Sequence, residues 1–374
     1  GRALSRIAGR PREREMNPPP YILGIETSCD ETAAAVVTGG GRVLSNVVAS
    51  QVKDHEAFGG VVPEIASRRH VELIEPVVKS ALAQAGVTLS DIGAVAVTQG
   101  PGLVGALLVG ISYAKALAYG LGVPVCGVNH LEGHLAAAKI EHELTYPHVG
   151  MVVSGGHTSL YRVDDEDTIE LVGQTQDDAA GEAFDKVAKL LHLGYPGGVV
   201  IERIAKGVDP GAFELPRPMI SDASFDFSFS GLKTAVLHLV QKEGIFDSAD
   251  LGFSGLPEPR KTAPGKESLI PLIAAAFQAA VVDVLATKAT RAVKAFGMDT
   301  LVVSGGVASN TALREELRAR CADEGVRLVI PSRAYCTDNA AMIGVAGLHH
   351  LARGRTAGLD MNALSRWDIA ASRR

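Results

Sequence analysis

The pentapeptide Val-Val-Ser-Gly-Gly occurs twice in this chain, at residues 152–156 and at residues 302–306. Each copy closes a short apolar run, which predicts a buried strand that ends in a tight turn. Glycines just beyond a strand allow backbone N–H groups to approach a phosphate or a ribose with no side chain between them. A single Gly-Gly turn is usually a plain turn. Two copies at strand ends, one of them before a helix, favour nucleotide binding in a chain built from two similar halves.

The apolar runs around the two copies support this duplication. The first half is expected to open with three strands separated by polar and glycine turns, and the second half restarts with two strands from His148. The expected strands are 21–26, 33–37, 43–48, 94–98, 123–128, 149–153, 159–163 and 300–303, and the expected helices are 71–85, 103–120 and 311–320. Such alternation predicts mixed or parallel sheets covered by helices on both faces. No Gly-x-Gly-x-x-Gly follows the first strand, so a plain dinucleotide-binding fold is excluded.

Composition places the chain among globular proteins of more than one domain. It has 374 residues, of which 47% are hydrophobic and 21% charged, a usual globular balance in a chain too long for one small core. No uninterrupted run of 18 apolar residues occurs, so no membrane span is expected. The four cysteines have no short mutual spacing, which predicts reduced thiols and a cytoplasmic location.

The first twenty residues differ from the rest of the chain. They carry five arginines and two glutamates and end in three prolines, without the apolar core of a signal peptide. We expect a disordered tail here, with Met16 as the natural start. Because this segment contributes +3 to a total charge of −6, the remaining residues carry −9. An acidic body binds nucleic acid poorly on its own, so an RNA role requires a local basic patch or a partner protein.

Two histidines four residues apart, His130 and His134, are candidates for a metal site. Residues i and i+4 of a helix share one face, and a distant carboxylate such as Asp338 would complete the ligand set. A zinc protease of the His-Glu-x-x-His type is excluded, because Glu132 lies two positions beyond His130 and points away from the metal. On spacing alone, two ordinary helix histidines remain the alternative. Asp338 has the alternative role of capping a helix expected at 339–348.

Ten segments of the chain, taken together, closely resemble one family: the tRNA N6-adenosine threonylcarbamoyltransferases, called TsaD in bacteria and formerly described as O-sialoglycoprotein endopeptidases. The likeness covers about residues 21–350, in order and at plausible spacing. The matching segments are 24–32, 63–68, 100–103, 129–134, 154–158, 177–186, 195–198, 227–234, 304–310 and 337–343. The resemblance implies an α/β fold of the actin, Hsp70 and sugar-kinase (ASKHA) superfamily, which is a duplicated, ribonuclease-H-like two-domain fold with its ligand in the cleft between the domains.

The resemblance also implies how the chain is divided. The expected parts are a disordered tail at 1–20, a first actin-like lobe at 21–145 completed by a C-terminal helix at about 338–352, a second actin-like lobe at 146–337 with an insertion at about 205–266, and a C-terminal tail at 353–374.

Site residues are carried over position by position from the same resemblance. The resemblance implies that one divalent metal, Fe²⁺ in preference to Zn²⁺, is bound by His130, His134 and Asp338. The residues implied to bind the adenylate substrate are Val152, Val153, Ser154, Gly155, Gly156, Asp185, Gly198, Glu202 and Asn310. Glu202 departs from the family, which commonly has an aspartate there, within Gly-Gly-Pro-x-Ile-Asp.

Several of these positions have ordinary roles when each is considered alone. Asp185 would be a solvated charge on an amphipathic helix, and Asn310 would be a helix N-cap. We place His157, near the first glycine turn, outside the ligand shell. No residue suggests itself as a general base.

The function that the resemblance implies is acyl transfer. The threonylcarbamoyl group would pass from threonylcarbamoyl-AMP to N6 of the adenosine 3′ of the anticodon, in tRNAs reading codons that begin with A. The implied partners are tRNA, a bacterial TsaB-like paralogue and a TsaE-like ATPase, with no membrane. Two alternatives remain: a metal-free ATPase or small-molecule kinase of the same fold, and a nucleotide-dependent scaffold subunit. Against a kinase, the turn Glu26-Thr27-Ser28 lacks an early aspartate.

Overall fold

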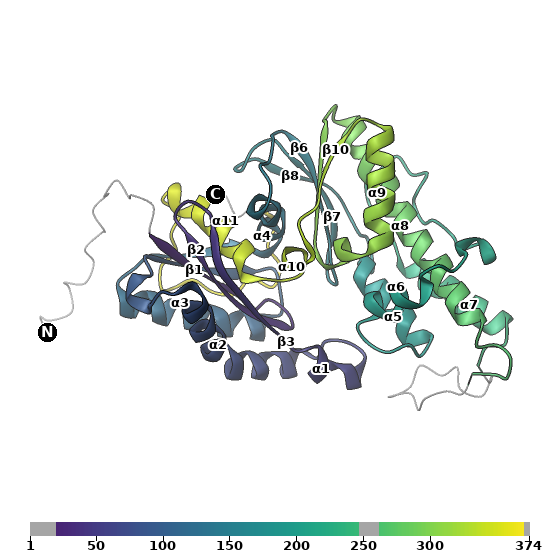
Figure 1. Cartoon of the computed structure of the whole chain (residues 1–374), viewed down its shortest axis with the longest axis horizontal. Helices are drawn as coiled ribbons and strands as arrows, with labels where there is room; N and C mark the ends of the chain where they lie inside the picture. Colours follow the sequence, from purple (N-terminus) through teal and green to yellow (C-terminus); the bar gives the residue numbers. More distant parts are fainter. Residues whose placement is uncertain (1–19, 247–261, 370–374) are drawn as a thin grey trace, which may run out of the picture.

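The structure, a computed structural model, describes residues 20–246 and 262–369 and consists of two lobes (Figure 1). Most of the expected N-terminal tail, residues 247–261 of the expected insertion and residues 370–374 lie outside the described residues. The strands are β1 (Tyr21–Glu26), β2 (Glu31–Thr38), β3 (Val43–Ser50), β4 (Ala94–Gly100), β5 (Val125–Asn129), β6 (His148–Val153), β7 (Thr158–Val163), β8 (Ile169–Gln174), β9 (Thr300–Ser304) and β10 (Arg327–Val329). The α-helices are α1 (Val52–His55), α2 (Pro63–Ala85), α3 (Val104–Leu121), α4 (His130–Ala137), α5 (Ala180–Leu190), α6 (Gly197–Ala205), α7 (Ser230–Lys242), α8 (Leu269–Ala295), α9 (Thr311–Asp323), α10 (Arg333–Cys336) and α11 (Ala340–Ala352).

Each lobe is built on a five-stranded mixed sheet, and the two sheets have the same strand order. The first runs β3-β2-β1-β4-β5, and the second runs β8-β7-β6-β9-β10 when followed from the corresponding edge. In both sheets the first three strands pair antiparallel, and two further strands continue parallel to the first strand. The duplicated α/β fold predicted from the sequence is therefore confirmed.

Helices cover both faces of the first sheet. On one face lie α2 and α3, and on the other lies α11, which returns from near the end of the chain. Alternate residues of β1 point to opposite faces, so Leu23 joins the core under α2 and α3, while Ile22 joins the core under α11. Gly24, on the same face as Ile22, allows α11 to approach closely, because a Cβ there would lie 2.3 Å from the carbonyl oxygen of Ala340.

The second sheet packs one face against a large core. This core joins β6, β7 and β9 to the helices α5, α6, α7, α8 and α9. Part of the expected insertion at 205–266 belongs to it, since Leu215, Phe227 and Phe229 are buried there. The second lobe therefore depends on this segment for its packing.

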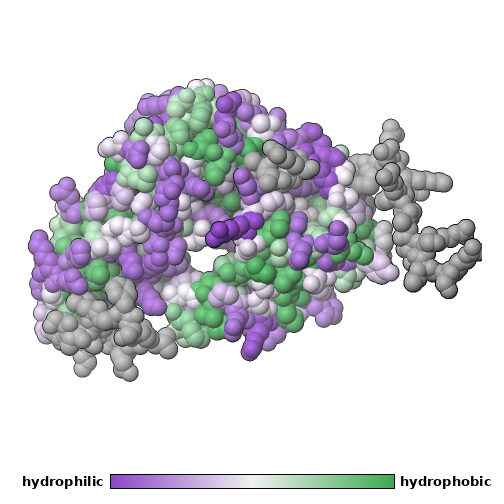
Figure 2. All heavy atoms as spheres, turned by 180° about the vertical axis from the view of Figure 1, so that it is seen from behind, coloured by the Kyte–Doolittle hydropathy of each residue, from purple (hydrophilic) through white to green (hydrophobic). Residues whose placement is uncertain are grey.

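Helix α4 lies between the two lobes. It follows β5 of the first sheet, packs against α11, and also contacts β6 and β9 of the second sheet. Leu131 and Leu135 of this helix share a buried cluster with Val152 and Tyr161 of the second lobe. Seen from behind, the surface opens between the lobes (Figure 2). The two histidines of the expected metal site thus stand on a helix that both lobes enclose.

Two segments differ from what the sequence suggested. α2 begins at Pro63, eight residues before the expected start at residue 71; proline suits the first turn of a helix, and the added turns lack a clear apolar period. The segment after α11 is held against the first lobe: Ala357 pairs with Val125 of β5, and the backbone N–H of Leu364 donates to the carbonyl of Gln99.

Two helices are long and apolar enough on average to cross a bilayer by length and composition, although polar residues interrupt both of them. These are α3, with a mean hydropathy of 1.5, and α8, with a mean hydropathy of 2.1. Both have a place in the fold: α8 runs through the core of the second lobe, and α3 packs against α2 and against β4 of the first sheet. Core helices of this kind meet the same criteria, so the two segments are weak evidence for a membrane span.

Candidate metal and nucleotide site

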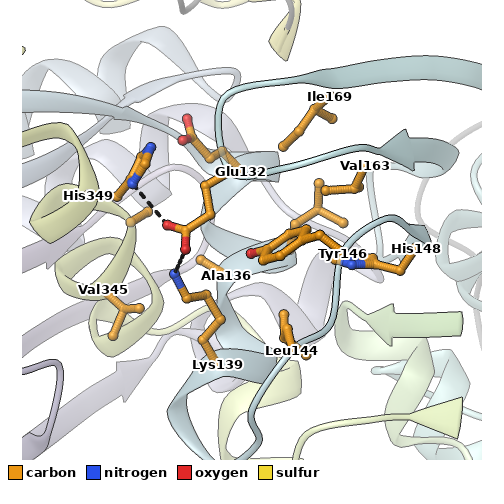
Figure 3. Close-up of a pocket in the computed structure, with 13 residues that line it drawn as sticks. Glu132, Ala136, Lys139, Leu144, Tyr146, His148, Val163, Ile169, Val345 and His349 are labelled. Atoms are coloured by element: carbon orange, nitrogen blue, oxygen red, sulfur yellow. Dashed lines mark ion pairs between the residues drawn. The ribbon is translucent and has the colours of Figure 1, made fainter. Parts of the chain in front are cut away.

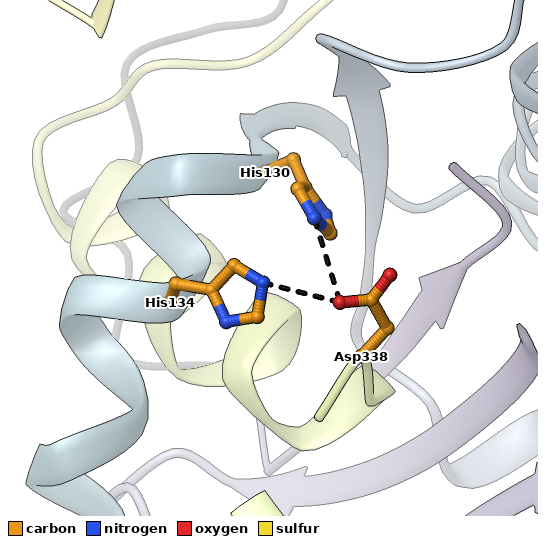
Figure 4. Close-up of side chains that lie close together, drawn as sticks. All are labelled: His130, His134 and Asp338. Atoms are coloured by element: carbon orange, nitrogen blue, oxygen red, sulfur yellow. Dashed lines mark ion pairs between the residues drawn. The ribbon is translucent and has the colours of Figure 1, made fainter. Parts of the chain in front are cut away.

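Three side chains converge between α4 and the start of α11 (Figure 4). His130 and His134 project from one face of α4, and Asp338 reaches toward them from the segment before α11. One donor atom from each residue lies within 4.8 Å of the other two. Oδ1 of Asp338 lies 3.1 Å from Nε2 of His134 and 3.6 Å from Nε2 of His130. The structure thus brings together the three residues that the sequence singled out for a metal.

Helix capping explains why Asp338 is available to the histidines. The N-cap of α11 is Asn339, whose side chain accepts a hydrogen bond from the backbone N–H of Met342. The alternative role considered for Asp338 therefore falls to its neighbour. Glu132 also behaves as its spacing suggests, since its carboxylate lies 2.9 Å from Nε2 of His350 and takes no part in the group of three.

The donor set fits a divalent metal ion. His134 is fully buried, and neither of its ring nitrogens makes a hydrogen bond within the described residues, although Nε2 lies close to Asp338. A buried polar atom without a partner is costly, and such atoms in native proteins commonly meet an ion or a water. Two imidazoles and one carboxylate are the ligand types expected for Fe²⁺ or Zn²⁺.

The electrostatic surroundings of the three side chains favour positive charge. Burial lowers the pKa of His130, but the carboxylates of Asp338 and Glu26 outweigh burial and raise the pKa to about 9. Burial raises the pKa of Asp338, but His130 and His134 outweigh it, so the pKa lies well below its usual range. Carboxylates that stabilise a proton on His130 would also stabilise a divalent cation at this place.

His157 connects this group with the first Gly-Gly turn. Its ring centroid lies 6.3 Å from that of His130. Its backbone N–H donates to the hydroxyl of Ser154, and its carbonyl accepts from the backbone N–H of the same serine. Burial, together with His130 and His134, lowers the pKa of His157 to about 4. A neutral imidazole, which the sequence gave no reason to place so near, therefore adjoins the metal-binding candidates at physiological pH.

The two Gly-Gly turns lie side by side, because β6 and β9 are parallel neighbours. Gly305 has a φ of +96°, and a Cβ there would lie 2.3 Å from the carbonyl oxygen of Val153; this backbone conformation is nearly confined to glycine. By contrast, no described atom lies within 4 Å of a Cβ built at Gly155 or Gly156. The second turn is therefore packed against the first, whose own glycines face open space.

Asp185 and Gly198 meet where α5 and α6 approach each other. The carboxylate of Asp185 accepts a hydrogen bond of 2.7 Å from the backbone N–H of Gly197, the residue before Gly198. Burial raises the pKa of Asp185 to about 6; the N–H bond opposes the shift, while Asp30 and Glu182 add to it. Asp185 is therefore a half-buried, hydrogen-bonded carboxylate, which argues against its being an ordinary solvated helix charge.

Glu202 and Asn310 meet at the start of α9. Oε1 of Glu202 accepts from both the backbone N–H and the hydroxyl of Thr311. The side chain of Asn310 accepts from the backbone N–H of Leu313, as an N-cap does, and donates to Gln278. Both side chains thus make hydrogen bonds that stabilise the start of α9. Oε2 of Glu202 and one amide hydrogen of Asn310 are not part of these bonds.

A separate pocket, partly open to solvent, lies between α4, α11 and the strands β7 and β8 (Figure 3). Its charged groups pair with one another: Glu166 lies 2.7 Å from Lys139 and 2.9 Å from His349. Neither the three metal-binding candidates nor the Gly-Gly turns line this pocket. It is therefore distinct from the expected site.

Comparisons with known proteins identify the family. The family model of TsaD, described as tRNA N6-adenosine threonylcarbamoyltransferase, matches residues 42–345. The chain belongs to this family. A relative of that name from Geobacter sulfurreducens is 54% identical over 348 residues, which cover 93% of this chain and 97% of the relative. Another, from Anaeromyxobacter dehalogenans, is 53% identical over 350 residues, covering 93% and 99%. The family predicted from the motifs is confirmed.

Solved structures with low sequence identity share the fold. Full-length HypF in a phosphate- and nucleotide-bound form aligns with a TM-score of 0.55 and 16% identity, over 88% of this chain and 46% of that chain. Component A of the (R)-2-hydroxyglutaryl-CoA dehydratase of Acidaminococcus fermentans aligns with a TM-score of 0.50 and 13% identity, over 89% and 99%. At these identities the likeness concerns the architecture alone.

Proposed function

We propose that this chain transfers a threonylcarbamoyl group from threonylcarbamoyl-AMP to N6 of the adenosine 3′ of the anticodon, in tRNAs reading codons that begin with A. The main support is a group of side chains suited to hold one metal ion, beside a glycine turn, in a member of the threonylcarbamoyltransferase family. A metal-free ATPase, a small-molecule kinase and a scaffold subunit are not favoured by that family membership.

The adenylate donor would lie along the glycine turns. Ser154, Gly155 and Gly156 would offer backbone N–H groups to its phosphate, since the space around both glycines is open. Val152 and Val153 would contribute backbone atoms only, because their side chains are buried in β6.

Four residues of the second lobe would hold the ribose and base of the donor. Asp185 of α5 contacts the start of α6, where Gly198 lies. Glu202 of α6 contacts the start of α9, where Asn310 is the N-cap. Asp185 would accept from a ribose hydroxyl, for which a buried carboxylate is a strong acceptor. Glu202 would use the oxygen that Thr311 leaves unused, which keeps a role for this residue despite its departure from the family pattern.

The reaction would be a direct acyl transfer. The N6 amine attacks the carbamoyl carbon, the bond from that carbon to the phosphate oxygen breaks, and AMP leaves with the electron pair. The attacking nitrogen gives its proton to water or to a donor oxygen. The contribution of the protein is to hold both reactants in line. Such positioning supplies a large part of the reduction of the activation barrier in reactions of this kind.

His130, His134 and Asp338 would hold one divalent metal, with Fe²⁺ preferred over Zn²⁺. When bound, such a metal orients an oxygen of the donor and polarises its carbonyl as a Lewis acid. The enzyme would act on tRNA in the cytoplasm.

Partner proteins would supply the positively charged surface that this acidic chain lacks for binding tRNA. We propose a TsaB-like paralogue and a TsaE-like ATPase as these partners. The outer side of α3 supports the need for a protein partner. Val104, Leu108 and Tyr119 on this helix are 47%, 40% and 76% exposed, and Val71 on the neighbouring α2 is 65% exposed. A partner that covers these apolar side chains would remove them from water.

The test is transfer to unmodified tRNA, measured with the partner proteins and a supplied adenylate donor. We expect the double variant His130→Ala, His134→Ala to lose transfer while it keeps the circular dichroism spectrum of the wild type. A matched control is His142→Ala, His238→Ala, which removes two exposed histidines outside the site and should retain activity. Full transfer by the first double variant would remove the metal from the mechanism.

A further inference from the structure

Glu26, at the end of β1, is a fully buried carboxylate that is not one of the three metal-binding candidates. Three donors surround it: the backbone N–H of Ser28, the hydroxyl of Thr98 at 2.6 Å from Oε2, and Nδ1 of His130 at 3.1 Å from the same oxygen. A carboxylate removed from water is tolerated only where such donors compensate it. This side chain therefore ties the ends of β1 and β4 to the first residue of α4.

These contacts decide which nitrogen of His130 carries the hydrogen. The carboxylate of Glu26 accepts hydrogen bonds, so Nδ1 must donate to it. The hydroxyl of Ser28, 3.2 Å from Nδ1, can share the same hydrogen as a second acceptor. In the neutral ring, Nε2 then keeps its lone pair, and Nε2 is the nitrogen that faces Asp338.

We propose that Glu26 is a positioning residue, which holds the His130 ring with Nδ1 protonated and Nε2 directed at the metal. This inference rests on the metal site of the proposed function and adds a residue beyond its ligands. A carboxylate that accepts from the remote nitrogen of a metal-binding histidine fixes the orientation of the ring and makes it a better ligand. Loss of such a partner typically lowers metal affinity about 10- to 100-fold.

The variant Glu26→Gln keeps the shape of the side chain but exchanges donor and acceptor in its hydrogen bond with His130. Its carboxamide oxygen must face the backbone N–H of Ser28, which can only donate, so its NH₂ group takes the place of Oε2. There the NH₂ group meets Thr98, whose hydroxyl can turn to accept, and Nδ1 of His130. Nδ1 can accept only if its hydrogen moves to Nε2, the nitrogen that the metal requires.

Affinity for Zn²⁺ alone, measured on the full chain by competition with a chromogenic chelator at pH 8, tests the proposal. We expect Glu26→Gln to bind Zn²⁺ about 10- to 100-fold more weakly than the wild type, with an unchanged circular dichroism spectrum. Histidine ¹⁵N spectra of the Zn²⁺-loaded wild type should show His130 protonated at Nδ1 and coordinated through Nε2.

Glu132→Gln is the matched control, because Glu132 lies on the same helix and also pairs with a buried histidine, His350, outside the metal group. It should keep the Zn²⁺ affinity of the wild type. Wild-type affinity in Glu26→Gln would overturn the proposal. Coordination of His130 through Nδ1 in the wild type would also overturn it, even if Glu26→Gln failed to fold. If the wild type itself binds no Zn²⁺, the metal site of the proposed function fails together with the positioning role. If the wild type binds Zn²⁺ tightly and Glu26→Gln binds it equally well, only the positioning role is refuted.

Discussion

Two glycine-to-alanine variants distinguish the structural from the ligand-binding role of the paired glycine turns. At Gly305, alanine would be forced to adopt a φ of +96° and a ψ of 160°, which costs a non-glycine residue on the order of 1–3 kcal/mol. Its Cβ would also lie 2.3 Å from the carbonyl oxygen of Val153, and overpacking of this kind costs about 1–3 kcal/mol more. We therefore expect Gly305→Ala to lower the free energy of unfolding by about 2–6 kcal/mol.

At Gly155 the same substitution meets open space, so the fold should tolerate it while the methyl group obstructs the proposed phosphate site. The assay combines thermal unfolding with the dependence of transfer rate on donor concentration. Gly305→Ala should melt about 2–8 °C below the wild type, and Gly155→Ala should melt with the wild type but show a raised KM for the adenylate. Gly306→Ala, whose Cβ would come no closer than 4.0 Å to Thr337, is the control for stability. Equal melting temperatures for all three variants would refute the packing argument, and an unchanged KM in Gly155→Ala would refute the assignment of the phosphate site.

Three further predictions follow from the charges and the surface. Burial raises the pKa of Asp185 to about 6, so its ionisation opposes folding as pH rises; Asp185→Asn should raise the melting temperature of the ligand-free protein at pH 8, should bring no gain at pH 4, and should weaken donor binding. The carboxylate of Glu166 raises the pKa of His349, so this pair stabilises the fold fully below about pH 6.5 and loses its effect as pH rises through the raised value. The difference in urea stability between wild type and His349→Gln should therefore shrink from pH 6 to pH 9, and a constant difference would contradict the ion pair. On the exposed side of α3, Leu108→Lys should weaken binding to a TsaB-like paralogue, measured by calorimetry, without changing the melting temperature.

Local patterns in the sequence predicted much of this fold. Short apolar runs and glycine turns located the strands of both sheets except β8 and β10, which were not predicted from the sequence. The repeated Val-Val-Ser-Gly-Gly located two parallel strand ends, which the structure places side by side. The spacing of His130 and His134 placed them on one helix face, and Asp338 was found because a distant carboxylate was sought. The four cysteines are free thiols, as expected. Each strand, turn or helix signal is local, because it is carried by residues that are close together in the sequence. Asp338 is the exception, and it was found because two histidines need a further ligand, such as a carboxylate.

Contacts between distant segments gave no comparable signal. Nothing near Glu26 in the sequence indicates that its carboxylate meets Thr98 and His130, more than seventy and one hundred residues away. The position of α4 between the lobes follows from the packing of Leu131 and Leu135 on the second sheet, which a helical pattern cannot predict. The first turns of α2 were missed because they lack an apolar period.

The central claim is that His130 and His134 of α4, together with Asp338 just before α11, bind one metal ion. The most direct measurement is the metal content of the purified chain after anaerobic reconstitution with Fe²⁺ or Zn²⁺, determined by elemental analysis for the wild type and for His134→Ala. The account predicts one tightly held ion per wild-type chain and its loss from the variant, with the secondary structure of both proteins unchanged. A wild-type chain that retains no metal, or a variant that retains as much as the wild type, would contradict it.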